Sequence, residues 1–357
     1  MKALILSGGK GTRLRPLTHT GAKQLVPIAN KPIIFYVIEN IVRAGIKDLG
    51  IIISPDTGEE VKKVVGDGRR WGVQIKYIVQ EKPQGLAHAV KVARDFLQDD
   101  DFLMYLGDNL LGDDIKKFKK EFTEQKPDAL ILLKEVSNPE SFGVAEVDDK
   151  GKVKRLEEKP KKPKSNLALV GVYIFSSRIH QIIDKLRPSL RGELEITDAI
   201  QQLIEQGRSV ISHTIDGWWL DTGKKDDLLS ANTVVLDELL ERDVEVGEVS
   251  DDSIVDGRVV LAKGVSVQNS EIRGPVIVGE NTVIENSFIG PFTSIGDNCE
   301  VRNANLEHSV VLKECQIQDV RDMRDSLLGR RSIVKKTNRK PQKSLRLMVG
   351  DDSKVEV

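Results

Sequence analysis

A glycine-rich loop with a single arginine stands near the start of the chain. The run Gly-Gly-Lys-Gly-Thr-Arg occupies residues 8–13 and follows directly after the apolar, strand-like run 3–6. A loop rich in glycine lets backbone amides approach a triphosphate closely, and an arginine adds positive charge. The spacing differs from the Gly-Lys-Ser/Thr loop of phosphate-cradling NTPases and from the Gly-x-Gly-x-x-Gly of dinucleotide-binding proteins. Because an ordinary strand-to-loop turn does not need Arg13, we interpret the run as a phosphate-binding loop.

Two aspartates stand out because each follows an apolar, strand-like run. Asp108 comes just after the run 101–106, and Asp221 follows the apolar run 218–220. In an open α/β sheet, residues that follow the strands lie at the carboxyl edge, where ligands bind. A turn or helix-capping aspartate is the alternative for either residue taken alone. As a pair, the two residues predict a cleft lined by carboxylates.

The elements that must position these residues alternate between strand and helix over residues 1–241. Apolar runs rich in β-branched residues are separated by segments of helical period, which is typical of a parallel sheet covered by helices. Between about 141 and 175, three strand-like runs follow one another closely and predict a small antiparallel extension of the core. Helices are expected over 32–42, 85–96, 195–206 and 224–241. We therefore predict an α/β domain with a mixed, mainly parallel sheet.

A repeat of about six residues appears after a charge-rich link at 241–252. Apolar residues recur every six positions from Ile272 to Ile284 and, after a five-residue step, again from Ile289 to Val301. A chance alternation of apolar and turn residues is the alternative, but the period persists over several coils and weakens only beyond residue 312. The pattern resembles left-handed β-helix proteins. It predicts a left-handed parallel β-helix over 250–335, followed by a tail, 336–357, that is either poorly ordered or docked on a neighbour.

Composition and charge argue against several classes of function. With 54 Lys and Arg against 55 Asp and Glu among 357 residues, the net charge gives no reason to expect nucleic acid or a membrane surface as partner. No apolar stretch approaches the roughly 18–20 residues that a membrane-spanning helix needs, and the first apolar run is too short for a signal peptide. Two cysteines, Cys299 and Cys315, do not form the disulfide framework of a secreted chain, so a cytoplasmic location is expected.

Further motifs follow the glycine-rich loop in a definite order. They are Lys-Gln-Leu-Val-Pro at 23–27, Asn-Lys-Pro at 30–32, Gln-Glu-Lys-Pro-Gln-Gly at 80–85, Gly-Asp-Asn at 107–109, Glu-Glu-Lys-Pro at 157–160 and Trp-Leu-Asp-Thr-Gly at 219–223. In this order the motifs resemble the sugar-nucleotide pyrophosphorylases, and in particular the thymidylyltransferases among them. The resemblance covers nearly the whole first domain, and the fused repeat domain is similar to that of the long-form members. It implies a Rossmann-like nucleotidyltransferase domain that joins a nucleoside triphosphate to a sugar 1-phosphate.

The resemblance implies dTTP and glucose 1-phosphate as substrates and Mg²⁺ as the metal. Asp108 and Asp221 are then the magnesium ligands, a pair of hard oxygen donors that triphosphate oxygens would complement. Arg13 is expected to hold the departing β and γ phosphates, and Lys23 to offset the negative charge that grows around the attacked phosphorus. Arg13, Lys23 and Asp108 are therefore the expected catalytic residues.

The same resemblance assigns residues to the two substrates. Gln80 is expected to recognise the base, because its amide offers a donor and an acceptor to a pyrimidine edge. Lys159, next to Glu158, is expected to hold the sugar phosphate and the sugar hydroxyls. The expected nucleotide-binding residues are Leu6, Gly8, Gly9, Gly11, Thr12, Arg13, Gln24, Gln80, Pro83 and Gly85. The expected sugar-phosphate-binding residues are Asp108, Asn109, Gly143, Glu158, Lys159, Val170 and Gly171.

Three alternatives differ in the nucleotide, in a second activity or in the absence of catalysis. Thymine and uracil differ by one methyl group, which an apolar pocket discriminates by only about 1–3 kcal/mol, so UTP is the first alternative. The Lys23–Gln24 pair is like that of thymidylyltransferases and favours dTTP. A bifunctional enzyme that also transfers an acetyl group would use His308 as a base. A sensor that only binds sugar nucleotide does not need the glycine-rich loop and both aspartates together.

Assembly is the last expectation that the sequence supports. The coils of a β-helix stack into prisms whose sides associate readily, so we expect a homo-oligomer formed through residues 250–330. The number of subunits is left open.

Overall fold

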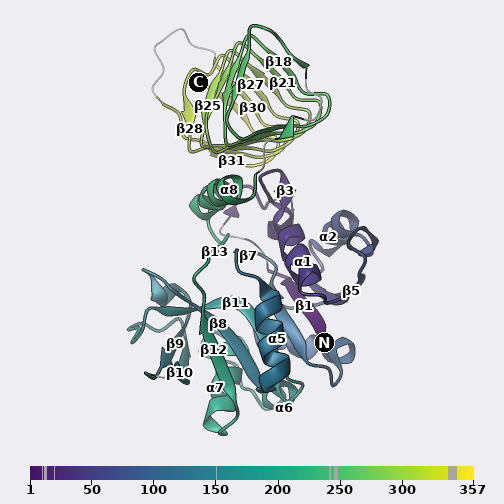
Figure 1. Cartoon of the computed structure of the whole chain (residues 1–357), viewed down its shortest axis with the longest axis vertical. Helices are drawn as coiled ribbons and strands as arrows, with labels where there is room; N and C mark the ends of the chain where they lie inside the picture. Colours follow the sequence, from purple (N-terminus) through teal and green to yellow (C-terminus); the bar gives the residue numbers. More distant parts are fainter. Residues whose placement is uncertain are drawn as a thin grey trace. The chain divides into compact units, whose positions relative to one another are not determined.

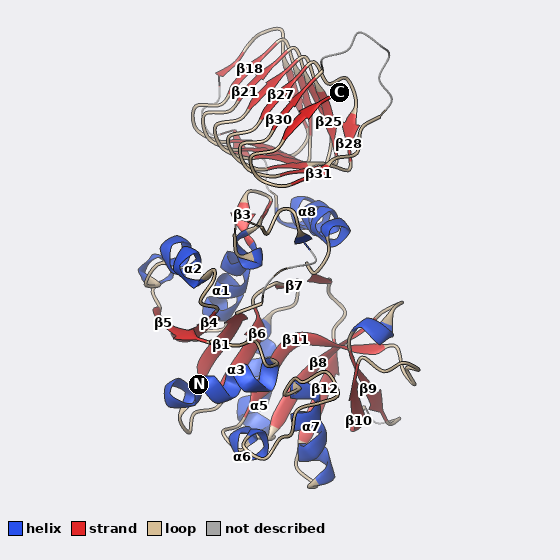
Figure 2. Cartoon of the chain, turned by 180° about the vertical axis from the view of Figure 1, so that it is seen from behind, coloured by secondary structure: helices blue, strands red, loops and turns tan. Residues whose placement is uncertain are grey.

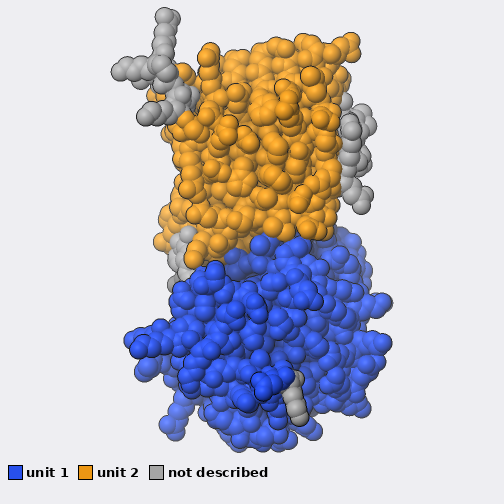
Figure 3. Space-filling model, turned by 60° about the vertical axis from the view of Figure 1, so that its left-hand side comes forward, with its two compact units in different colours: residues 1–10, 33–221 blue, residues 11–32, 222–357 orange. Residues whose placement is uncertain are grey.

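The computed structural model describes residues 1–9, 11, 14–19, 21–149, 151–240, 243–244, 248–336 and 344–357. The chain divides into two compact units, Met1–Lys10 with Ile33–Asp221 and Gly11–Pro32 with Thr222–Val357, which Figure 3 colours separately. This division differs from the predicted boundary at residue 241, because residues 11–32 and the helix after Asp221 cluster with the repeat region. No helix in the described ranges is long and apolar enough to cross a membrane.

The first unit is built on a mixed sheet whose centre is parallel. Its parallel strands, in order across the sheet, are β6 (Phe102–Leu106), β1 (Lys2–Ser7), β4 (Asp48–Ile53) and β5 (Gln74–Val79). Ile5 of β1 pairs with Ile51 on one side and with Tyr105 on the other, and all three are fully buried. The central strands are almost continuously apolar because helices cover both faces of such a sheet. The predicted α/β domain is confirmed.

An antiparallel part extends the sheet beyond β6. It consists of β8 (Ala129–Glu135), β9 (Gly143–Val147), β10 (Val153–Glu158), β11 (Leu167–Phe175) and β12 (Val210–Thr214), of which β12 runs parallel to its neighbour β8. The second half of β11 pairs with β6, whereas Ala168 in its first half pairs with β9. Its register against β8 shifts between Leu169 and Tyr173, so Val170 and Gly171 lie where β11 changes partner. The predicted antiparallel extension is confirmed.

Two layers of helices cover this sheet (Figures 1 and 2). α1 (Ile33–Arg43) and α5 (Ile115–Gln125) contact each other on one face. α3 (Leu86–Val92), α6 (Ile179–Ile183) and α7 (Ile196–Glu205) contact one another on the opposite face. The remaining helices of this unit are α2 (Gly58–Val65), α4 (Arg94–Leu97) and the short 3-10 helices Arg69–Trp71 and Pro139–Ser141.

One predicted helix of the first unit is divided in the structure. The helix expected over 85–96 consists of α3 and α4, because Ala93 leaves the helical conformation at ψ 4°. The expected helices over 32–42 and 195–206 correspond to α1 and α7.

The second unit is a left-handed parallel β-helix together with α8 (Lys225–Leu239) and the segment 11–32. Five coils give one strand to each of three parallel sheets, which Figure 2 shows as stacked arrows; within the described residues the last two coils give strands to the first two sheets only. The first sheet comprises β14 (Asp243–Val244), β17 (Val259–Leu261), β20 (Val276–Val278), β23 (Thr293–Ile295), β26 (Val310–Val311), β29 (Leu327–Leu328) and β31 (Met348–Val349). The second comprises β15 (Glu248–Val249), β18 (Ser266–Gln268), β21 (Val283–Glu285), β24 (Glu300–Arg302), β27 (Gln316–Gln318), β30 (Ile333–Lys335) and β32 (Lys354–Glu356). The third comprises β16 (Ile254–Asp256), β19 (Glu271–Arg273), β22 (Phe288–Ile289), β25 (Asn305–Glu307) and β28 (Met323–Arg324).

A coil of 17 residues explains why the six-residue repeat is imperfect. Ile272 pairs in register with Ile289 of the next coil, and both are fully buried. Hydrogen-bonded partners on successive coils, such as Ser270 and Ser287, are likewise 17 residues apart. Two sides of the coil therefore take six residues and the third takes five. At one corner Asn281 adopts a left-handed backbone conformation (φ 55°), which asparagine tolerates better than most residues.

The last residues of the chain complete the β-helix. β31 pairs with β29 and β32 pairs with β30, and the side chains of Leu345, Leu347 and Val355 pack against the apolar core. This differs from the predicted end of the β-helix at residue 335 and from the predicted tail over 336–357. A few apolar residues at alternate positions are enough to close a coil, so the polar composition of this stretch was a poor guide.

Candidate active site

The two predicted carboxylates come together at one end of a short ribbon in the first unit. β7 (Asn109–Leu111) follows β6 and pairs antiparallel with β13 (Trp219–Asp221). In this register Asp221 lies opposite Asn109, the direct neighbour of Asp108. Both aspartates are half-buried, so neither is sealed in the core. The ribbon brings together residues that are more than 100 positions apart in the sequence.

Asn109 is buried and both ends of its amide are held. Its Nδ2 donates to Oδ1 of Asp108 at 2.9 Å, and its Oδ1 accepts from Nε1 of Trp219 at 2.7 Å. The Trp219 ring in turn contacts Phe142 edge to face, with 5.2 Å between the ring centroids. Asn109 therefore orients the carboxylate of Asp108, a role that the sequence did not suggest. Trp219 belongs to the predicted motif 219–223, but the sequence assigned it no role of its own.

The chemistry of these donors fits magnesium. Mg²⁺ prefers hard oxygen ligands, keeps several waters, and is commonly held by one or two carboxylates together with substrate phosphates. Asp221 ends β13, and Asp108 directly precedes β7, the strand that pairs with it, so the ribbon supplies two carboxylates near one end. In the part of the chain that the structure describes, no group of three or more His, Cys, Asp or Glu is gathered as for a metal held by protein alone. A magnesium ion here would take its remaining ligands from the substrate and water.

The start of the glycine-rich loop lies beside the predicted base-recognition residue. A Cβ on Gly8 would be only 3.1 Å from Oε1 of Gln80, so glycine lets this amide lie against the loop. Space is open around Gly9, which is exposed, while Leu6 is buried at the end of β1. The hydroxyl of Ser7 is fully buried and has no hydrogen-bond partner among the described residues. Ser7 was not among the predicted site residues, although it belongs to the same motif.

Gln80 is oriented by a histidine to which the sequence assigned no role. Its backbone N–H donates to the Ile53 carbonyl at 2.9 Å, and its Nε2 lies 2.9 Å from Nδ1 of His88. Burial, followed by the charge of Lys91, lowers the pKa of His88, which favours the neutral ring. A neutral ring can accept the Gln80 amide hydrogen at Nδ1, and this leaves Oε1 of Gln80 directed toward Gly8.

The turn after Gln80 is closed by a loop from elsewhere in the first unit. Gly85 has φ 99°, and a Cβ there would be 2.4 Å from the Leu194 carbonyl oxygen. The backbone of Leu194 bonds on both sides of this glycine, to Gln84 at 2.8 Å and to Ala87 at 3.0 Å. Glycine is therefore required at residue 85 for close approach of another backbone. Pro83 lies in the same turn and is exposed.

The predicted sugar residues form two groups that Phe142 connects. Gly171 lies against Asn109, because a Cβ at this glycine would be 3.0 Å from Oδ1 of the amide, and Val170 precedes it in the core. Lys159 takes a left-handed backbone conformation (φ 43°), and its N–H donates to the Phe142 carbonyl at 3.0 Å. The Phe142 ring contacts the Trp219 ring, which binds Asn109.

Glu158 is surrounded by charged and polar side chains that the sequence analysis missed. Nη1 of Arg191 lies 3.2 Å from Glu158 and 3.3 Å from Glu195, and the Thr197 hydroxyl lies 3.3 Å from Glu158. A Cβ on Gly143 would be 3.2 Å from Glu158 Oε2, so this glycine makes room for the carboxylate. Burial raises the pKa of Glu195, while the Ser189 hydroxyl bond opposes the rise. Arg191 therefore links two carboxylates, one of them almost fully buried.

The remaining predicted residues belong to the second unit or lie outside the described residues. Thr12 and Arg13 are outside the described residues. Gly11 has φ 59°, and a Cβ on it would be 3.0 Å from the Lys23 Cβ. Lys23 and Gln24 lie in a 3-10 helix, Lys23–Leu25, and both are buried. The Gln24 Oε1 atom has no hydrogen-bond partner within the described ranges.

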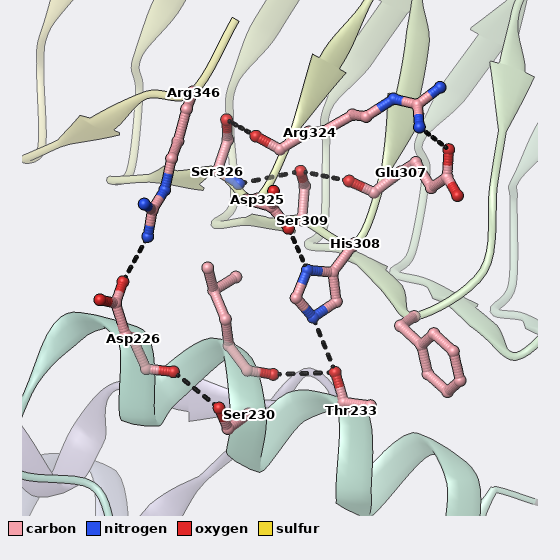
Figure 4. Close-up of polar contacts among 12 residues, drawn as sticks. Asp226, Ser230, Thr233, Glu307, His308, Ser309, Arg324, Asp325, Ser326 and Arg346 are labelled. Carbon is pink, nitrogen blue, oxygen red and sulfur yellow. Dashed lines mark hydrogen bonds and ion pairs between the residues drawn. The ribbon is translucent and has the colours of Figure 1, made fainter. Parts of the chain in front are cut away.

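His308, the candidate base for a second activity, is engaged through both ring nitrogens. Its Nδ1 bonds the Asp325 carboxylate, and its Nε2 lies 2.9 Å from the Thr233 hydroxyl of α8, as Figure 4 shows. The Thr233 hydroxyl also bonds the Leu229 carbonyl of its own helix at 3.1 Å. This arrangement fastens α8 to the β-helix and gives no support to a role in acyl transfer.

The fold and the site define the class of protein. A mixed α/β sheet with a glycine-rich loop after its first strand, two aspartates at the β7–β13 ribbon and a fused β-helix agree with the fold expected of a sugar-nucleotide pyrophosphorylase. A family model described as nucleotidyl transferase matches residues 2–238. The chain belongs to the nucleotidyl transferase family.

Individual relatives show which members of the family the chain resembles. The chain is 51% identical to a glucose-1-phosphate thymidylyltransferase of Streptomyces antibioticus, over 100% of this chain and 99% of the relative. It is 47% identical to the low-salt glycan biosynthesis nucleotidyltransferase Agl11 of Haloferax volcanii over all of both chains. A solved structure from Bacillus anthracis, described as a glucose-1-phosphate thymidylyltransferase in complex with a sucrose, is 38% identical with a TM-score of 0.63 and covers 70% of this chain and 98% of its own.

Proposed function

We propose that this chain is a glucose-1-phosphate thymidylyltransferase. In the proposed reaction an oxygen of the glucose 1-phosphate attacks the α phosphorus of dTTP in line. The bond from that phosphorus to the bridging oxygen of the β phosphate breaks, dTDP-glucose forms and pyrophosphate leaves. The observation that carries the proposal is the full-length identity of about half of all residues with Streptomyces enzymes of this name.

The chain's own residues have distinct roles in this proposal. Asp108 and Asp221 would hold Mg²⁺, which when bound would neutralise charge on the phosphate oxygens. Arg13 holds the β and γ phosphates that leave, and Lys23 offsets the charge that grows at the attacked phosphorus. Asn109 supports the proposal because it fixes the Asp108 carboxylate. No covalent enzyme intermediate is needed, since positioning and charge stabilisation carry most phosphoryl transfers.

Substrate recognition is proposed for two groups of side chains. Gln80 reads the pyrimidine edge, with Gly8 and Gly85 shaping the space around the base. Glu158 and Lys159 bind the sugar and its phosphate, with Gly143 and Gly171 leaving room for the hexose. The close approach of Gly8 to Gln80 and of Gly143 to Glu158 supports these assignments.

UTP is the rival nucleotide, and one comparison of substrates tests both readings. The Haloferax relative is nearly as similar, and its name specifies neither a nucleotide nor a sugar. Pyrophosphate release with Mg²⁺ and glucose 1-phosphate is measured with dTTP, UTP, ATP, CTP and GTP at equal low concentration. We expect the fastest release with dTTP. Fastest release with UTP would move the assignment to a uridylyltransferase, and no release with any of the five would contradict the proposed reaction.

The proposal extends to the organisation of the protein. We propose that residues 1–241 are the catalytic domain, which the family match over 2–238 supports. We also propose a cytoplasmic location, since the two cysteines are buried as free thiols. A homo-oligomer through the β-helix is expected to appear in light scattering as a multiple of the 39.7 kDa chain mass. A monomeric mass would contradict it.

A further inference from the structure

The segment that carries Lys23 and Gln24 is anchored on the β-helix by a buried asparagine. We propose that the β-helix positions these two residues for catalysis and that Asn232 of α8 is the positioning residue. The proposal rests on the proposed nucleotidyl transfer, which gives Lys23 and Gln24 their roles. All of the contacts that carry it lie within the second unit.

Asn232 connects three parts of the chain through one side chain. It is 1% exposed on α8. Its Oδ1 accepts from the Ala29 backbone N–H at 2.9 Å and from the Ser294 hydroxyl at 2.7 Å. Its Nδ2 donates to the Phe292 carbonyl at 3.1 Å. Ala29 lies at the tip of the hairpin that follows Gln24, and the other two partners belong to a coil of the β-helix, so this amide ties the hairpin to both α8 and the coil.

A second hydrogen bond fixes the same hairpin directly. The hairpin consists of β2 (Pro27–Ile28) and β3 (Lys31–Pro32), and its tip residues Ala29 and Asn30 have φ 45° and 60°. Nδ2 of Asn30 donates to the Ile295 carbonyl of β23 at 2.7 Å. The turn therefore contacts the β-helix through a backbone amide and through a side chain.

Apolar packing surrounds these polar contacts. Side chains from the segment, from α8 and from the first sheet of the β-helix surround one small cavity. They include Leu17, Val26, Leu228, Val310 and Leu327. At the end of the β-helix, Gly350 approaches Pro16 so closely that a Cβ would be 2.9 Å from the Pro16 carbonyl. The segment is thus in contact with the β-helix on both sides of Lys23.

Two further contacts fasten α8 to the β-helix. Arg346 bonds the Asp226 carboxylate at 2.5 Å, and His308 bonds the Thr233 hydroxyl, as Figure 4 shows. Burial raises the pKa of Asp227 on this helix, while the backbone bond from Lys224 and the charges of Lys224 and Lys23 oppose that rise. α8 is therefore fixed to the β-helix by both contacts.

Loss of Asn232 should displace the segment rather than only loosen the fold. Removal of the amide leaves the buried Ala29 N–H and the part-buried Phe292 carbonyl without their partner, which costs free energy that a shift of the hairpin toward new partners would recover. Displacement of a catalytic group by about 1 Å can lower a rate by roughly 100-fold. Because Lys23 is proposed to stabilise charge in the transition state, we expect its displacement to lower kcat and to leave the KM for glucose 1-phosphate nearly unchanged.

The test combines kinetics with hydrogen exchange on the full-length protein. Asn232→Ala is expected to lower kcat at least tenfold, to change the KM for glucose 1-phosphate by less than about threefold, and to raise amide exchange in the peptide containing Ala29. Thr233→Val is the matched control, since it removes the contact between α8 and His308 without touching the hairpin. This control is expected to lower the melting temperature while kcat stays within twofold of the wild type.

Each outcome decides the proposal. Unchanged exchange at Ala29 in Asn232→Ala would show that the anchor does not hold the hairpin, and raised exchange with an unchanged kcat would show that the anchor does not serve catalysis. An equal fall of kcat in Thr233→Val would reduce Asn232 to a general stability role.

If Asn232→Ala does not fold, Asn30→Gly replaces it in the test. This variant removes the second hydrogen bond while glycine accepts the positive φ, and the same two readouts apply. If the wild type releases no pyrophosphate with any nucleotide, the proposed function fails, and the exchange result still decides whether the anchor exists.

Discussion

Asp108 is the residue whose environment most clearly suggests a function. Its carboxylate accepts from the Asn109 amide, which is held on its other side by the Trp219 indole. A carboxylate that is oriented in this way but half-buried is placed to bind a ligand rather than to support the core. Asp221 lies across the ribbon from Asn109.

Neutralising Asp108 should therefore affect turnover more than folding. Asp108→Asn keeps the size of the side chain and removes its charge, and we expect kcat/KM for pyrophosphate release to fall by at least ~100-fold. The melting temperature should change little. Asp114→Asn is a matched control, because Asp114 caps α5 through Oδ1 and asparagine can do the same. Full activity in Asp108→Asn would rule out the metal assignment.

If Gln80 reads the base as proposed, His88 should make that recognition sensitive to pH. Burial and Lys91 lower its pKa below the ordinary 6.5, so the folded protein favours the neutral ring and the unfolded chain takes up the proton first as pH falls. The contribution of this histidine to stability is therefore lost as pH falls below about 6.5. A protonated ring would present an N–H to Gln80, and the amide would have to reverse.

We expect the KM for dTTP to rise as pH falls through this range, because a reversed Gln80 turns its oxygen away from Gly8. His88→Gln removes the titrating ring but keeps an acceptor, so its KM should depend less on pH. Measuring KM for dTTP from pH 5 to 8 in both proteins separates this effect from titration of the triphosphate, which is common to both. Parallel pH profiles would show that His88 does not govern the base site.

At the scale of elements, buried serines join successive coils of the β-helix. The Ser270 hydroxyl accepts from the Ser287 N–H at 3.0 Å, and the Ser287 hydroxyl accepts from the Ala304 N–H at 3.1 Å. Each hydroxyl also donates to the carbonyl two residues before it, at 2.7 Å. These bonds satisfy backbone groups at a corner where no strand pairing is available to them.

Breaking this row should destabilise the second unit without changing its chemistry. Ser287→Ala leaves the Ala304 N–H without its partner, and we expect a loss of about 1–3 kcal/mol in the free energy of unfolding. Chemical denaturation measures it. Ser266→Ala, on the preceding coil, removes only a 3.3 Å contact with the exposed Gln268 and should be close to neutral. Equal stability of the two variants would contradict the proposed contribution of the row.

At the scale of the whole molecule, the last coil covers the end of the β-helix core. Leu328 and Val334 are fully buried, and their strands pair with β31 and β32. Removing residues 344–357 would expose these side chains and the open edges of two sheets, which favours aggregation. We expect a lower melting temperature and increased binding of a hydrophobic dye. An unchanged melting temperature would show that the last coil is dispensable.

The division of the chain into two units was not predictable from motifs. The glycine-rich loop is continuous in sequence, yet residues 11–32 cluster with the β-helix while Met1–Lys10 belongs to the sheet unit. The reason is that the hairpin tip bonds Asn232 and the Ile295 carbonyl, residues more than 200 positions away. Such contacts leave no local pattern in the sequence. The repeats themselves were predictable because most inward residues recur after five or six positions.

The sequence by itself determined the α/β domain, the β-helix and the order of the motifs, because apolar period and glycine placement are local properties of the chain. It also led to the prediction of Asp108, Asp221 and Gln80 as site residues, because their motifs are contiguous. Only the tertiary structure decided what holds these residues: Trp219 on Asn109, His88 on Gln80, Arg191 on Glu158. The partner of a polar side chain depends on which distant strands and loops lie next to each other and in which register, and no local period encodes that.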